Sequence, residues 1–189
     1  MLSTMMHTSL GVNTLFRFGA RHFANSRVAD YDGEHLQWRS YEDVDSLAGR
    51  IASGLAALGV GNGDRVGTFL WNGVTHLGVY LAAPSMGAVL HTLNCRLAPD
   101  QIAYIINHAN DCCVFVDGRL EAQFQPVLSQ IPGVRHIIVC DPQGGLDDDR
   151  MITLESLLSN HDCDYDWPEI PETQAAGICY TSGTTGNPK

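Results

Sequence analysis

Basic residues, long apolar runs and paired cysteine motifs are all scarce in this sequence of 189 residues. Lysine and arginine together number 11 against 21 aspartates and glutamates, which gives a formal net charge of -10. A nucleic-acid partner is not expected, because such a partner requires a basic face that displaces counterions. An anionic membrane surface should not attract the chain either.

No apolar run approaches the roughly 18 residues of a membrane-spanning helix, and residues 1–7 lack the basic and apolar regions of a signal peptide. We therefore expect no transmembrane segment and a cytoplasmic protein. The six cysteines include no C-x-x-C pair, so reduced thiols are expected and no zinc cluster is predicted. Three cysteines that interrupt apolar runs are predicted to be small core residues of strands: Cys113, Cys140 and Cys179.

The composition that remains, 44% hydrophobic and 17% charged, is that of a globular protein with a full core. Apolar runs typical of buried strands alternate with segments of helical periodicity. Strands are predicted at residues 65–70, 89–92, 113–117, 136–140 and 176–180, and helices at 41–58, 72–87, 99–109, 119–131 and 153–158. This alternation predicts an α/β fold, mainly a parallel sheet flanked by helices with right-handed crossovers. Residues 141–150 are predicted to form a solvated acidic loop.

The first 60 residues predict a helix, a hairpin and a second helix. The first helix is predicted to start at a cap provided by Asn13 or Thr14 and to end near residue 25, with three residues facing the core: Leu15, Phe16 and Phe23. The hairpin would pair residues 28–31 with residues 36–39. Ser40 and Asp43 are spaced as a capping box, and Gly59 stands where a left-handed helix cap belongs.

The chain ends in its most chemically loaded stretch, Tyr-Thr-Ser-Gly-Thr-Thr-Gly-Asn-Pro-Lys at residues 180–189. Glycines let backbone N–H groups converge on an anion, and hydroxyls and an ammonium add donors, so phosphate is the expected ligand. The apolar run at 175–180 predicts a buried strand that delivers this loop to the ligand-binding end of a sheet. The pattern is not a Walker loop, because Pro188 precedes Lys189 and the two glycines are only three residues apart. A kinase or GTPase is therefore excluded.

Residue for residue, this loop resembles the phosphate-binding signature of the adenylate-forming (AMP-binding) superfamily, which includes acyl-CoA synthetases, luciferases and peptide-synthetase adenylation domains. The resemblance implies that the loop holds the β- and γ-phosphates of ATP. It also implies that the Thr181 hydroxyl approaches Mg²⁺ and that Lys189 takes part in catalysis. The residues that it assigns to ATP binding are Thr181, Ser182, Gly183, Thr184, Thr185, Gly186 and Lys189.

Three further blocks, residues 65–72, 87–97 and 101–109, resemble the medium-chain fatty-acyl and methylthiopropanoate CoA ligase branch of that superfamily. One departure is Cys95, where the branch usually has proline. A less rigid loop is expected there, since proline fixes φ. His91 at a strand end and Asn94 in a turn are interpreted as packing and hydrogen-bonding residues.

The resemblance implies an enzyme that joins a carboxylic acid to ATP, giving an acyl-adenylate and pyrophosphate, and then passes the acyl group to CoA. Residues 1–189 are expected to be the N-terminal portion of the AMP-binding domain, with the rest of that domain and a C-terminal domain absent. Such a fragment should be inactive alone. The alternatives are a non-catalytic truncated product that binds polyphosphate and an adenylation domain that loads a carrier protein. The composition is also compatible with a homo-oligomer.

Overall fold

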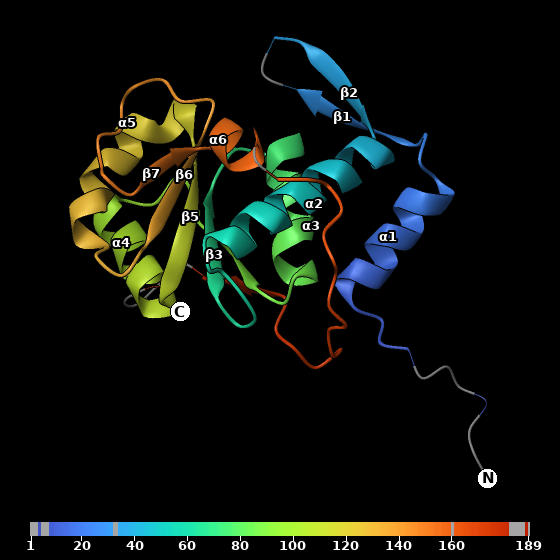
Figure 1. Cartoon of the computed structure of the whole chain (residues 1–189). Helices are drawn as coiled ribbons and strands as arrows, with labels where there is room; N and C mark the ends of the chain where they lie inside the picture. Colours follow the sequence, from blue (N-terminus) through green and yellow to red (C-terminus); the bar gives the residue numbers. More distant parts are fainter. Residues whose placement is uncertain (1–3, 5–7, 32–33, 160, 182–187, 189) are drawn as a thin grey trace.

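The computed structural model describes residues 4, 8–31, 34–159, 161–181 and 188, and its centre is a six-stranded sheet (Figure 1). Every neighbouring pair of strands in this sheet is parallel, in the order β7-β6-β5-β3-β4-β8. The strands are β3 (Arg65–Phe69), β4 (Val89–Thr92), β5 (Asp111–Asp117), β6 (His136–Cys140), β7 (Met151–Thr153) and β8 (Gly177–Cys179). The predicted parallel α/β fold is confirmed.

Helices cover both faces of the sheet. On one face α2 (Tyr41–Ala57), α3 (Val74–Ser85) and α6 (Leu154–Ser159) enclose a core that includes Phe115 and Ile138. On the other face α4 (Pro99–Ala109) and α5 (Glu121–Phe124) enclose a second core. Interior strands buried on both faces are mainly apolar, and all seven residues of β5 are buried, with an aspartate at each end.

The N-terminal hairpin lies apart from the central sheet (Figure 1). β1 (Arg27–Tyr31) and β2 (Leu36–Ser40) pair antiparallel as predicted, while residues 32–33 of the connecting loop lie outside the described residues. The capping box is confirmed, because Ser40 Oγ accepts from the Asp43 N–H at 3.0 Å and Asp43 Oδ2 accepts from the Ser40 N–H at 2.9 Å. This capping box starts α2, and Gly59, with a φ of 75°, follows the end of α2.

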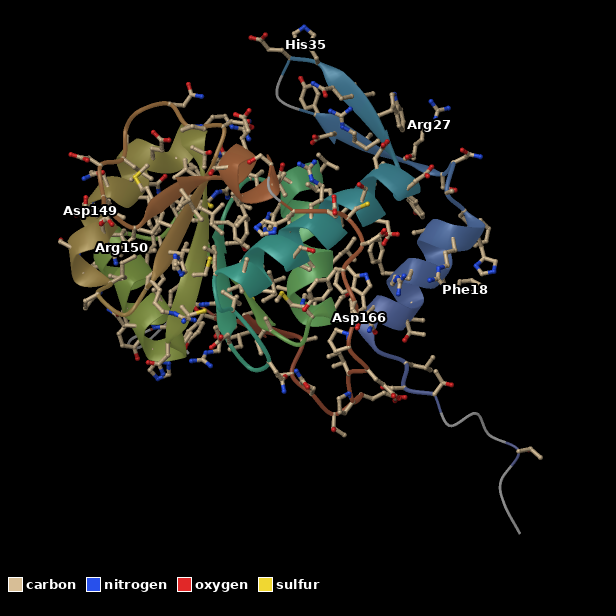
Figure 2. The ribbon with its side chains drawn as sticks, viewed as in Figure 1. Phe18, Arg27, His35, Asp149, Arg150 and Asp166 are labelled. Carbon is tan, nitrogen blue, oxygen red and sulfur yellow. The ribbon has the colours of Figure 1, made fainter. Side chains whose placement is uncertain are left out.

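The cap and two of the three core residues predicted for the first helix are wrong. α1 (Val12–His22) begins after Gly11 with no side-chain cap. Asn13 lies inside the first turn, where its Nδ2 donates to the Pro168 carbonyl at 2.7 Å and its Oδ1 accepts from the Thr14 N–H at 2.7 Å. Leu15 and Phe23 were expected in the core but are 61% and 57% exposed. Phe16 does pack against the core. Figure 2 shows Phe18, a further exposed aromatic residue, on the outer side of α1.

Three segments between the strands also differ from the predictions. In place of one helix over residues 119–131 the chain forms η1 (Gly118–Leu120), α5 and η2 (Gln125–Gln130). Pro126 lies in η2 and has no N–H for an α-helical hydrogen bond. α3 starts at Val74, after Gly73, rather than at residue 72. The three-residue strand β7 was missed, because a run this short carries no periodic signal.

The strand predicted at residues 175–180 is present but is not buried, and this difference has a greater consequence. β8 is the outermost strand of the sheet, and Gly177 and Cys179 are exposed. The prediction that Cys179 is a core residue is therefore wrong, whereas Cys113 and Cys140 are buried as expected. Among the described residues, none of the helices has the length and apolar character needed to cross a bilayer.

Candidate nucleotide-binding edge

The phosphate-binding loop predicted from the sequence starts at the carboxyl edge of the parallel sheet. β8 pairs with β4 in parallel, with Ile178 opposite His91 and Cys179 opposite Thr92. Tyr180 and Thr181 therefore follow β8 on the edge where strands of open α/β sheets present their ligand-binding loops. The start of the loop therefore lies at that end of the sheet as expected, although the strand before it is not buried.

The loop itself is described only at its ends. Thr181 is exposed directly after β8, and Pro188 is buried. The predicted ATP ligands Ser182, Gly183, Thr184, Thr185, Gly186 and Lys189 lie outside the described residues. Their contacts with phosphate, and the contact of Thr181 with Mg²⁺, therefore stay predictions.

A polar cavity opens where the strand connections diverge. The chain leaves β3 toward β4 on one side and leaves β5 toward β6 on the other, so the carboxyl ends of β3 and β5 form a topological switch point. A cavity of about 270 Å³ lies there, and its lining includes Trp71, Asn72, His76, Asp117 and Arg119. Sequence reasoning missed this cavity, because it depends on the spatial order of strands.

Three of the side chains that line this cavity have defined polar partners. Arg119 Nε and Nη2 donate to the two carboxylate oxygens of Asp117 at 2.9 and 2.8 Å. Burial acts to raise the pKa of Asp117, but the hydrogen bonds from Arg119 outweigh it and the pKa is lowered. His76 Nε2 lies 3.0 Å from Thr68 Oγ1, and burial lowers the pKa of its imidazole. At neutral pH the cavity therefore holds an ion pair and a neutral imidazole.

A buried, hydrogen-bonded histidine–aspartate pair lies beneath the start of the loop. The side chains of His91 on β4 and Asp111 on β5 are both fully buried, and His91 Nδ1 lies 2.7 Å from Asp111 Oδ2. Because β3 separates these strands, the imidazole must reach across β3 at Gly67, the residue paired with His91. A Cβ on Gly67 would lie 2.9 Å from Asp111 Oδ2. Glycine at this position therefore makes room for the pair.

Tyr180 connects this pair to the loop. Its ring lies 5.1 Å from the His91 ring between centroids, and its hydroxyl lies 2.5 Å from Nδ1 of His108 on the last turn of α4. The expectation that His91 and Asn94 are packing and hydrogen-bonding residues is confirmed, since Asn94 Oδ1 accepts from the Arg96 N–H at 2.9 Å. The partners of His91 could not be inferred, because they come from three other elements.

The acidic loop after β6, predicted to be solvated, contains partly buried side chains that pair with one another. Asp148 and Arg150 form a two-point ion pair with N–O distances of 2.7 Å, and both side chains are mostly buried. Figure 2 shows Arg150 and its neighbour Asp149 on this side of the molecule. In the part of the chain that the structure describes, no three His, Cys, Asp or Glu side chains are arranged to hold a metal ion.

Comparison with known proteins gives the relationship of this chain. It is 35% identical over 193 residues to a 3-methylmercaptopropionyl-CoA ligase of Ruegeria lacuscaerulensis, and 36% identical over 197 residues to a medium-chain-fatty-acid–CoA ligase of Ectopseudomonas oleovorans. Both alignments cover 100% of this chain but only 36% and 35% of the relatives. The chain thus spans about a third of the length of these ligases.

Solved structures agree with this relationship. The anthranilate CoA ligase AuaEII in complex with anthranoyl-AMP superposes with a TM-score of 0.85 over 100% of this chain and 35% of its own, at 17% identity, which shows a shared fold. The inhibitor-bound N-terminal domain of FACL13 from Mycobacterium tuberculosis superposes with a TM-score of 0.75 over 95% of this chain and 43% of its own, at 27% identity. The family model described as AMP-binding enzyme matches residues 16–189. The chain therefore belongs to the AMP-binding enzyme family.

Proposed function

We propose that the protein containing this chain is an acyl-CoA ligase, which activates a carboxylic acid with ATP to an acyl-adenylate and transfers the acyl group to CoA. The observation that carries the proposal is the Tyr-Thr-Ser-Gly-Thr-Thr-Gly-Asn-Pro-Lys loop, which follows a parallel strand at the carboxyl edge of the sheet in a member of the AMP-binding family. CoA ligases among the relatives, including one named for a medium-chain fatty acid, support linear acids of short to medium chain as substrates.

The physical task of the first step is to bring two anions together. A carboxylate is already ionised near neutral pH and needs no general base to attack the α-phosphorus. Backbone amides at Gly183 and Gly186, the loop hydroxyls and the Lys189 ammonium would bind the triphosphate and stabilise the departing pyrophosphate. The Thr181 hydroxyl follows β8 directly and would approach Mg²⁺ bound with ATP, which supplies further positive charge.

The chain offers a direct test of nucleotide binding, because Lys189 is the only lysine in its 189 residues. An acyl-phosphate derivative of ATP transfers its acyl group to an amine that lies beside the phosphates. We expect mass spectrometry to find the label on Lys189 and excess ATP to prevent labelling. The α-amino group of Met1 serves as an internal control whose labelling should not respond to ATP. Labelling of Lys189 that excess ATP leaves unchanged would contradict a phosphate-binding loop.

The reaction is tested by pyrophosphate exchange into ATP in the natural protein, with a panel of fatty acids and amino acids. We expect exchange with linear carboxylic acids and formation of the acyl thioester when CoA is added. Exchange with amino acids alone would instead favour an adenylation domain that loads a carrier protein. No exchange with any acid, combined with ATP-sensitive labelling of Lys189, would favour a non-catalytic product that binds polyphosphate.

Two loop variants separate the role of backbone shape from the role of charge. If the glycines have positive φ, Gly186→Ala imposes strain of about 1 to 3 kcal/mol and crowds the phosphates, so it should weaken ATP use at every salt concentration. Lys189→Ala removes one charge on a flexible stem and should give a smaller loss that shrinks at high salt. The measurement is exchange rate against ATP concentration at low and high salt. If Lys189→Ala lowered the exchange rate more than Gly186→Ala at both salt concentrations, the lysine would be assigned to the chemical step.

A further inference from the structure

A continuous set of side-chain contacts runs across the sheet to the start of the proposed nucleotide loop. It begins at Asp111 on β5, passes over Gly67 on β3 to His91 on β4, and reaches Tyr180 after β8. We propose that the His91–Asp111 pair and the hydrogen bond from Tyr180 to His108 are a positioning device that determines where the loop starts. The proposal rests on the proposed function and adds positioning residues that do not themselves contact the nucleotide.

Among the described residues, the strand that leads into the loop is paired with one other strand. β8 is three residues long, lies at the outer edge of the sheet and pairs with β4. Edge strands of this length have few ladder hydrogen bonds to oppose fraying. The Tyr180 side chain, by contrast, is half-buried and has two contacts beyond the strand, one with His91 and one with His108. Tyr180 is therefore the side chain best placed to restrain the end of β8.

Both contacts of Tyr180 are tied to one corner of the fold. His108 and Asp111 are three residues apart and flank the turn from α4 into β5, where Asn110 has a φ of 55°. Arg65 holds this turn, since its Nε donates to the Ala109 carbonyl at 2.7 Å and its Nη2 to the Asn110 carbonyl at 2.9 Å. The turn thus presents His108 to the Tyr180 hydroxyl and Asp111 to the imidazole beneath the Tyr180 ring.

The His91 imidazole is unusual because half of its hydrogen-bonding capacity is unused. Nδ1 lies within 3.0 Å of both Asp111 oxygens, while Nε2 is buried without a hydrogen-bond partner among the described residues. A buried polar atom without a partner costs free energy, which the contact of Nδ1 with Asp111 offsets. The ring is the surface on which Tyr180 packs. Thr181, the first proposed ligand, follows Tyr180 directly, so displacement of the Tyr180 ring displaces the start of the loop.

The first experiment measures hydrogen exchange and needs no activity. Tyr180→Phe keeps the ring and removes the hydroxyl, and His108→Ala removes its partner. We expect each variant to accelerate amide exchange in the peptide spanning residues 177–189 by about 2- to 10-fold, the range of one net hydrogen bond. The double variant should be no faster than either single variant, because both remove the same contact. Tyr80→Phe, at an exposed tyrosine on the opposite face of the sheet, is the matched control.

The second experiment measures ATP use in pyrophosphate exchange by the natural protein. Tyr180→Phe and His108→Ala should raise the KM for ATP by about 2- to 10-fold with kcat and the melting temperature unchanged. His108→Asn places an amide near the position of Nδ1 and should restore most of the affinity. The positioning role would be overturned if the amide hydrogen-exchange rates of residues 177–189 were unchanged in both single variants. It would also be overturned if the increases in these rates were additive in the double variant. If the natural protein showed no pyrophosphate exchange with any acid, the proposed function would be overturned instead. Amide hydrogen exchange would still decide the positioning role.

Discussion

β6 and β8 belong to the same parallel sheet and both are short and apolar, yet their side chains differ in burial. Ile138 and Cys140 of β6 are 0% and 5% exposed, whereas Ile178 of β8 is half-buried and Cys179 is exposed. β6 has β5 on one side and β7 on the other, and both of its faces are covered by helices. In the part of the chain that the structure describes, β8 has β4 as its neighbour. The burial of a short apolar strand is therefore set by its neighbours rather than by its composition.

Arg150 holds β7, the second neighbour of β6, in place. Arg150 immediately precedes β7, and its guanidinium donates to the carbonyls of Ile131 and Leu128 at 2.7 and 2.9 Å as well as to Asp148. These bonds attach the start of β7 to the segment that leads into β6. An arginine satisfied by several acceptors can be partly buried, because each donor that leaves water finds a replacement. The acidic loop thus helps to cover the edge of β6.

The largest expected effect comes from the buried pair that links the interior of the sheet to β4, the neighbour of β8. His91→Leu should leave the Asp111 carboxylate buried without its partner and reduce the free energy of unfolding by about 3 to 5 kcal/mol. The double variant His91→Leu/Asp111→Leu should recover part of this loss, since no buried polar group is then left without its partner. Urea unfolding followed by circular dichroism measures both. A loss no greater than that of His108→Ala, at an exposed histidine, would contradict a structural role for the pair.

The comparison of the two strands is tested most directly with one substitution made in each. Ile138→Ala should reduce the free energy of unfolding by about 2 to 5 kcal/mol, as expected for a fully buried side chain. Ile178→Ala should cost less than half as much, because Ile178 is half-buried and its surroundings can adjust. The measurement is again urea unfolding of both variants. Equal losses would show that β8 is as well packed as β6.

Acid should weaken the contact that secures β7. Hydrogen bonds from Arg150 lower the pKa of Asp148 below its value of about 3.9 in an unfolded chain. Asp148 therefore stabilises the fold fully above about pH 4, and this contribution is lost as the pH falls through the lower folded value. The stability difference between the wild type and Asp148→Asn should be constant between about pH 5 and 7 and shrink below about pH 4. Asp149→Asn, at the exposed neighbour, should show no such change.

The smallest perturbation is thiol labelling of the unaltered chain. Cys179 is exposed and should react rapidly with a maleimide under native conditions. Cys113 and Cys140 are buried, and burial raises the pKa of both thiols, so they should react only after unfolding. Mass spectrometry of tryptic or chymotryptic peptides identifies the modified residues. Equal rates for Cys140 and Cys179 would remove the distinction between the two strands.

Local patterns in the sequence determined most of the elements. The spacing of Ser40 and Asp43, the glycine at position 59 and Pro99 at a helix start are signals whose partners lie within a few residues, and each predicted a boundary that the structure has. The alternation of strands and helices predicted the parallel sheet for the same reason. The loop at residues 180–189 was likewise recognised from consecutive residues, and its placement at the carboxyl edge followed from the parallel strand before it.

Tertiary structure alone decided which elements are buried and which side chains meet. Leu15 and Phe23 looked like core residues but are exposed, because α1 is packed along one side against α2 and α3. The cavity at the ends of β3 and β5 and the contact of His91 with Asp111 both depend on the order β5-β3-β4, in which β4 and β5 are consecutive in sequence but separated in space. Sequence patterns report the periodicity of one segment at a time, whereas strand order is selected by the joint packing of all of them.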